Sequence, residues 1–143
     1  MPDLRHLYQT IMLENARHPR HSGILTGPNV NQITVHNPTC GDELILSGTI
    51  AHAKLIAIAQ QSQGCIISQA SASIMADLVL GKSFQQIQEL AAIFVRLVDG
   101  HKVNQPDLLQ QAVAFAGVGQ FSMRVKCALL PWQALTQLIE GDQ

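Results

Sequence analysis

The sequence predicts an α+β fold in which a small antiparallel sheet packs against several helices. Residues 30–35, 44–50 and 55–61 are rich in β-forming side chains and are separated by turn residues, which is typical of strands. From Cys65 onward the apolar residues recur at helical spacing instead. Hydrophobic residues make up 47% and charged residues 13%, so the chain can bury a core rather than remain disordered.

The first helix is predicted to begin at Asp3, a capping residue, and to end before Pro19, because apolar residues recur at helical spacing between them: Leu4, Leu7, Tyr8 and Ile11. Residues 18–29 contain prolines and glycines and are predicted to form a loop. The two later strands, 44–50 and 55–61, are predicted to form a hairpin, although the residues between them lack an Asn-Gly turn signal.

The second half is predicted to contain four helices. One starts near Cys65 and reaches Gly81, which suits a C-terminal cap, and Ser83 with Gln86 forms a capping-box pattern that opens the next. Residues 107–116 form another. The last is predicted to follow Cys127 and to start close to Pro131, because proline is acceptable in the first turn of a helix.

The length, net charge and apolar runs of the sequence indicate the number of domains and exclude some classes of function. The 143 residues are close to the ~150 of one domain, so we expect a single domain over 1–143. A net charge of −1 without a basic block argues against nucleic-acid binding. The longest apolar runs, 55–59 and 91–95, are too short to cross a membrane, and the N-terminus lacks the apolar core of a signal peptide. We therefore expect a cytoplasmic protein without a membrane partner.

The three cysteines lie at predicted boundaries between elements: Cys40 in a turn, Cys65 between a strand and a helix, and Cys127 ahead of the last helix. They form no C-x-x-C pair, which argues against a disulfide framework and a zinc ribbon. A free cysteine is usually a small buried hydrophobic residue. Ligands, however, gather where loops meet rigid elements, so the boundary positions favour a metal site.

Asp42 strengthens the prediction of a metal site. Gly41 permits unusual backbone angles, so Cys40 and Asp42 can turn towards a common centre. Three thiolates and one carboxylate suit tetrahedral Zn²⁺, and thiolates select zinc or iron–sulfur units. Alternatively, Asp42 is an ordinary turn residue that accepts backbone N–H bonds, and His36 takes its place as ligand.

The basic residues Arg124 and Lys126 precede Cys127 at a predicted helix start, where the helix dipole disfavours cations. A zinc ion with three thiolates and a carboxylate has a formal charge of −2, which two cations would offset. They would also favour thiolate over thiol at Cys127. Alternatively they are a solvated basic pair.

The chain resembles the SufU branch of the IscU-like (NifU N-terminal-like) family over essentially its whole length. The resemblance lies in NPTCGD at 37–42, GCIISQASAS at 64–73 and RVKCA at 124–128 with Trp132, together with Pro19, Arg20 and Gly23. The 62-position step from Cys65 to Cys127 is similar to the SufU form, and Lys126 stands where IscU scaffolds typically have histidine. Ser122 and Pro131 depart from the pattern.

The resemblance implies an IscU/SufU-like fold and a zinc ion bound by Cys40, Asp42, Cys65 and Cys127. It also implies a partner, a SufS-type cysteine desulfurase that carries pyridoxal phosphate and supplies persulfide sulfur. Cys40 matches the sulfur acceptor of the family, and Arg124 matches a basic residue beside the site. Our hypothesis is a zinc-dependent sulfurtransferase that serves downstream iron–sulfur assembly proteins. The alternatives are a scaffold that assembles and transfers a [2Fe–2S] cluster, and a purely structural zinc domain.

Overall fold

The computed structural model describes residues 4–38 and 41–141. A first helix leads into three strands, and helices make up the remainder. The elements are α1 (Arg5–Arg17), β1 (Val30–Asn37), β2 (Asp42–Ala51), β3 (Lys54–Gln63), α2 (Ile66–Val79), α3 (Phe84–Val98), the 3₁₀ helices η1 (Pro106–Phe115) and η2 (Val118–Gln120), and α4 (Ser122–Glu140). The α+β prediction is confirmed.

The sheet is an antiparallel meander in the order β1-β2-β3. At one end Asn37 pairs with Asp42, and at the other Ala51 pairs with Lys54 across a two-residue turn. His52 and Ala53 form that turn with φ of 53° and 58°. Hairpin turns with two positive φ angles match the twist of the strands, so the predicted hairpin forms without the usual Asn-Gly.

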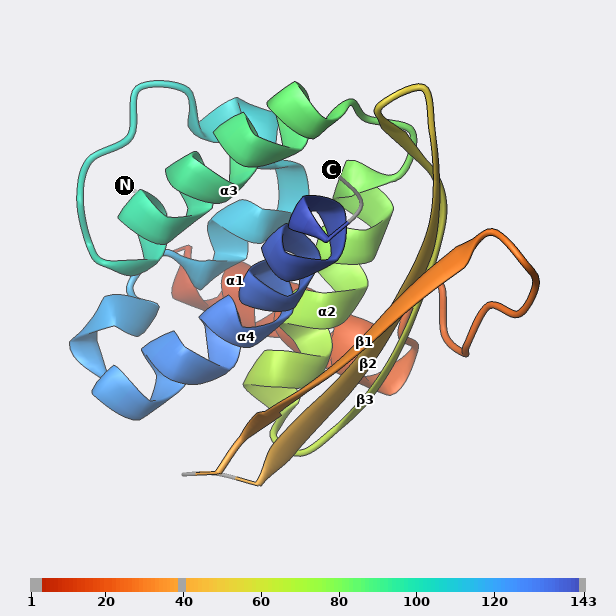
Figure 1. Cartoon of the computed structure of the whole chain (residues 1–143). Coiled ribbons are helices and arrows are strands. Elements are labelled where there is room, and N and C mark those ends of the chain that lie inside the picture. The colour runs from red at the N-terminus through yellow and green to blue at the C-terminus, as the bar shows by residue number, and fades with distance from the viewer. Residues whose placement is uncertain (1–3, 39–40, 142–143) are drawn as a thin grey trace.

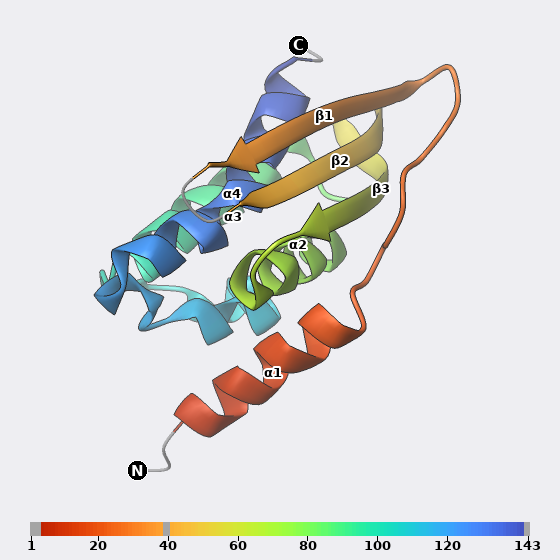
Figure 2. The ribbon, with the colours of Figure 1, turned by 90° about the horizontal axis from the view of Figure 1, so that it is seen from below.

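The helices cover one face of the sheet in two layers. Helices α2 and α4 lie directly against the strands, and α1, α3 and η1 lie beyond them (Figure 1). Seen from below, the three strands lie side by side over α2 and α4 (Figure 2). Side chains alternate along β2, so Leu44 and Leu46 point into the core while Ile45 is only half-buried. On the helical side the ring of Trp132 stacks on Phe94 with centroids 4.6 Å apart.

Two of the predicted helix ends are confirmed in detail. Ser83 caps α3, and both hydrogen bonds of the capping box with Gln86 are present. Gly81 follows α2 with a φ of 83°, a left-handed angle that glycine adopts without steric cost. The predicted helix over 107–116 is a 3₁₀ helix, with non-helical angles at Gln110. Asp3, the predicted cap of α1, lies outside the described residues.

The predicted start of the last helix is wrong. Helix α4 begins at Ser122, so Cys127 lies within it and Pro131 lies in its interior. Proline cannot donate the N–H that the carbonyl of Cys127 would receive in a regular helix. The helix continues because residues on both sides of the proline are buried in the core, and tertiary packing outweighs local propensity: Ala128, Trp132, Leu135, Leu138 and Ile139.

Candidate metal centre

Asp42 is the first residue of β2 and is 1% exposed. It has the same parity as Leu44, so its side chain points to the helical face of the sheet. Gly41 precedes it with a φ of 72°, and the Gly41 N–H donates to the carbonyl of Asn37 at 2.9 Å. The positive φ at Gly41 therefore favours glycine at this position, and the Asp42 carboxylate that follows it lies in the protein interior.

Cys65 is the N-cap of α2, as predicted, and is half-buried. The backbone N–H of Ser68 donates to its Sγ at 3.4 Å, and the Ser68 Oγ lies 3.7 Å from the same sulfur. The Cys65 sulfur therefore lies at the N-terminus of α2, where it accepts a backbone N–H.

Cys127 lies in the second turn of α4 and is 4% exposed. Helix α4 approaches α2 closely there, because small residues of α2 are fully buried at the contact. The Ser71 Oγ donates to the carbonyl of Ala128 at 2.6 Å and ties the two helices together. Ser68, Ser71 and Ser73 are all buried along α2.

Asp42, Cys65 and Cys127 converge from three elements. Their ligand atoms all lie within 4.8 Å of one another. The Cys65 N–H donates to Oδ1 of Asp42 at 2.8 Å, and the Cys65 Sγ lies 3.7 Å from Oδ2. Tetrahedral zinc with ~2.3 Å bonds to sulfur places ligands about 3.8 Å apart, so the arrangement fits such an ion after a small contraction. The fourth predicted ligand, Cys40, lies outside the described residues.

The other residues singled out from the sequence are exposed. Arg124 and Lys126 are exposed on the first turns of α4. The Arg124 guanidinium stacks over the ring of Phe121, 4.6 Å from its centroid, and its effect on the thiols stays a prediction. His36 is exposed on β1, with Nδ1 3.7 Å from the Glu43 carboxylate, so Asp42 and not His36 lies with the two cysteines.

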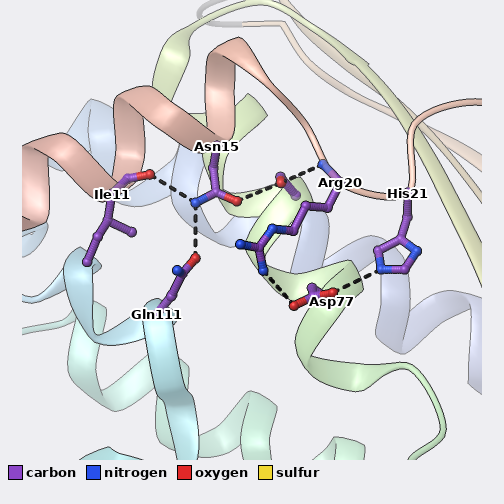
Figure 3. A network of polar contacts seen from close by, with 7 residues as sticks. Ile11, Asn15, Arg20, His21, Asp77 and Gln111 are labelled. Atoms are coloured by element: carbon purple, nitrogen blue, oxygen red, sulfur yellow. Dashed lines mark hydrogen bonds and ion pairs between the residues drawn. The ribbon is translucent and has the colours of Figure 1, made fainter.

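Sequence reasoning missed a second polar cluster, which joins α1 to the second half of α2 (Figure 3). The buried Asn15 donates to the carbonyl of Ile11 at 2.9 Å and to the Gln111 side chain at 3.1 Å. Its Oδ1 accepts from the Ser73 Oγ at 2.7 Å, and that hydroxyl accepts the Arg20 N–H at 2.9 Å. An asparagine in an amphipathic helix is normally a surface residue, so the pattern held no sign of this role.

The same cluster ends in an ion pair at the surface. The Arg20 Nη1 lies 2.8 Å from Oδ2 of Asp77, and the His21 Nε2 lies 3.1 Å from Oδ1. Burial raises the pKa of Asp77, but hydrogen bonds from His21 and Arg20 and the Arg20 charge outweigh it, so its pKa is lowered. The cluster holds the loop after α1 against α2.

Within the described ranges, no helix is long and apolar enough to span a lipid bilayer.

In a comparison with protein families, residues 7–128 match the model described as the NifU-like N terminal domain. Two curated proteins are similar along most of their length. The iron–sulfur cluster assembly scaffold protein IscU of Streptococcus pyogenes serotype M1 is 39% identical over 96% of this chain and 85% of its own. The zinc-dependent sulfurtransferase SufU of Bacillus subtilis is 32% identical over 96% of this chain and 92% of its own.

Solved structures show the same fold. A crystal structure described as a hypothetical protein superposes with a TM-score of 0.87 at 39% identity, covering 96% of this chain and 99% of the other. A putative iron–sulfur cluster assembly scaffold protein for the SUF system from Fervidobacterium islandicum AW-1 gives 0.85 at 26% identity, covering 96% and 99%.

Proposed function

The chain belongs to the NifU-like N-terminal domain family, and from that premise we propose that it is a zinc-dependent sulfurtransferase. It would accept persulfide sulfur from a SufS-type cysteine desulfurase and pass it on for iron–sulfur cluster assembly. The observation that carries the proposal is the convergence of Asp42, Cys65 and Cys127. The similarity to the sulfurtransferase of Bacillus subtilis supports it.

The residues proposed to hold the metal are Cys40, Asp42, Cys65 and Cys127. Zinc would keep the thiols deprotonated without redox chemistry of its own. The chain contributes the shape of the site. Asp42 is oriented by the Cys65 N–H, the Cys65 sulfur accepts the Ser68 N–H at the start of α2, and Cys127 is buried in α4. Arg124, exposed on the first turn of α4, is proposed to offset the negative charge there.

Cys40 is proposed to be the sulfur acceptor, because Cys127 is 4% exposed and Cys65 is half-buried at a helix start. The Cys40 thiolate attacks the outer sulfur of the persulfide on the desulfurase. The sulfur–sulfur bond of that persulfide breaks, and the desulfurase cysteine leaves as a thiolate. Cys40 then carries the persulfide. The exchange consumes no oxidant or reductant.

The test compares wild type with Cys40→Ser in the presence of a SufS-type desulfurase and cysteine. Serine nearly preserves the volume of the side chain but removes the soft nucleophile. We expect wild type to raise desulfurase turnover and to show one extra sulfur on Cys40 by mass spectrometry. The variant should still bind the desulfurase, because one side chain rarely carries a whole interface. If Cys40→Ser keeps its zinc and stimulates turnover like wild type, the transfer mechanism is wrong.

The second candidate is a scaffold for a [2Fe–2S] cluster, and the 39% identity to a protein named as a scaffold favours it. The same thiolates could hold iron. Lys126, next to Cys127, offers no imidazole, so anaerobic incubation with iron, cysteine and a desulfurase should give little stable cluster. Lys126→His should raise iron binding. A brown wild-type protein that passes stoichiometric iron and sulfide to an apo-ferredoxin would decide for the scaffold.

A further inference from the structure

Gly64 lies between β3 and Cys65 with a φ of 126°, an angle that other residues adopt only with strain. A Cβ at this position would lie 2.8 Å from the Cα of Asp42 and 3.0 Å from its Cγ, and closer still to Oδ1. Such distances are shorter than a side-chain carbon tolerates. With Asp42 where it is, position 64 has room for glycine alone.

Asp42 has little freedom to move away. Its backbone is fixed at the start of β2, where it pairs with Asn37. Its side chain is 1% exposed, and Oδ1 accepts the Cys65 N–H at 2.8 Å. The Asp42 carboxylate is therefore held in two ways: Gly64 packs closely against it, and the Cys65 N–H donates a hydrogen bond to it.

This arrangement divides the work between the two carboxylate oxygens. Oδ1 is held by the backbone N–H of Cys65, whereas Oδ2 lies 3.7 Å from the Cys65 Sγ. A carboxylate whose one oxygen already accepts a strong hydrogen bond offers the other oxygen to a metal ion. Because Oδ1 accepts the Cys65 N–H, the oxygen that remains for a metal ion is Oδ2.

We propose that Gly64 is a positioning residue that sets Asp42 as a one-oxygen metal ligand. Oδ1 stays on the Cys65 amide and Oδ2 alone faces the ion. The proposal rests on the proposed function only in requiring a metal ion at Asp42, Cys65 and Cys127. Because Oδ1 is anchored independently of the metal, the carboxylate stays in place while the thiols around it exchange partners.

The test compares Gly64→Ala with Gly81→Ala. Gly81 has a φ of 83°, yet a Cβ there meets nothing within 4 Å, so it carries the backbone strain without the contact to Asp42. Co²⁺ is the probe, with affinity measured by chelator competition and coordination by the visible spectrum. Gly64→Ala should weaken binding at least about tenfold and alter the spectrum as Asp42→Ala does. Gly81→Ala should stay within about threefold of wild type. A folded Gly64→Ala with wild-type affinity and spectrum would overturn the proposal.

A double variant keeps the test decisive if Gly64→Ala does not fold. Asp42→Ala removes Oδ1 and Cγ, two of the three Asp42 atoms that the new methyl group would meet, and leaves only the Cα. Gly64→Ala should therefore cost less stability in the Asp42→Ala background than in wild type. If both misfold, the glycine serves another purpose and the proposal fails. Neither readout uses a desulfurase. A protein that binds Co²⁺ as expected but leaves desulfurase turnover unchanged would sink the proposed function and leave the role of Gly64 standing.

Discussion

Helix α2 carries one polar cluster at its N-terminus and another along its second half, and the two differ in how their polar atoms are paired. We call them the sulfur cluster (Asp42, Cys65, Cys127) and the clasp (Asn15, Arg20, His21, Ser73, Asp77, Gln111). In the clasp the polar groups form a chain of contacts of 2.7 to 3.1 Å. The chain runs from Gln111 through Asn15 and Ser73 to Arg20, and from Arg20 through Asp77 to His21. In the sulfur cluster the thiols and the carboxylate converge within 4.8 Å.

This difference in pairing indicates which of the two clusters requires a metal ion. The clasp balances its own charges, since Asp77 faces Arg20 and His21 and donors match acceptors. The sulfur cluster gathers three groups that become anions when they lose a proton, and bringing such charges together is costly without a cation. One end of α2 is therefore suited to hold the fold, and the other to hold a metal.

The largest expected effect comes from removing the metal. With free zinc about a thousandfold above its dissociation constant, binding should stabilise the folded protein by about 4 kcal/mol. Chelation should therefore lower the melting temperature by about 10 °C for a chain of this size. Cys127→Ser should melt at the low temperature with or without zinc, because the proposed site loses a buried thiol. Thermal unfolding followed by circular dichroism, with zinc measured by elemental analysis, tests this.

Breaking the clasp should cost stability without touching the metal. Asn15→Ala removes the acceptor of the buried Ser73 hydroxyl and the amide that donates to the Gln111 side chain, and should lower the free energy of unfolding by about 2 kcal/mol. The matched control is Thr10→Ala on the same helix. The exposed Thr10 hydroxyl donates to the His6 carbonyl, and its removal should cost less than about 0.5 kcal/mol. Urea unfolding gives both values.

The clasp and the sulfur cluster are independent of each other if zinc raises the melting temperature of Asn15→Ala by as much as that of wild type. An Asn15→Ala protein that also loses its zinc would show that the clasp supports the metal centre, and the contrast between the two ends of α2 would be wrong.

The sequence predicted most of the fold because the change from strand to helical periodicity at Cys65 is sharp. The hairpin was correct even without Asn-Gly, since the β-forming runs on both sides fix the pairing. The start of α4 failed for a tertiary reason: the helix passes through Pro131 because its neighbours are buried in the core. That residues 1–143 form one domain stays a prediction.

The proximity of three candidate ligands was also predictable. Asp42, Cys65 and Cys127 were singled out because they match family motifs and were predicted at element boundaries, and the structure brings them together although Cys127 lies within α4. Their role as metal ligands stays a prediction. Cys40 lies outside the described residues, so its role stays a prediction. Gly64 was not recognised as a positioning residue because its role depends on a contact with Asp42, which no local spacing reveals.

The smallest expected effect concerns the exposed end of the clasp. Asp77→Asn removes the ion pair with Arg20 and changes the contact with His21 while it keeps the shape of the side chain. The Asp77 side chain is 44% exposed, so solvent screens these pairs and the loss should be under about 1 kcal/mol. Because folding lowers the pKa of Asp77, its contribution is present above the unfolded pKa, near 4, and is lost as pH falls through the folded value. Wild type and Asp77→Asn should therefore differ in urea unfolding at pH 7 and converge in acid below both pKa values. Zinc content should be equal in the two proteins at pH 7.

A difference in stability between wild type and Asp77→Asn that grows as pH falls below 4 would contradict this prediction. It would show that another group, and not the Asp77 carboxylate, stabilises this end of α2.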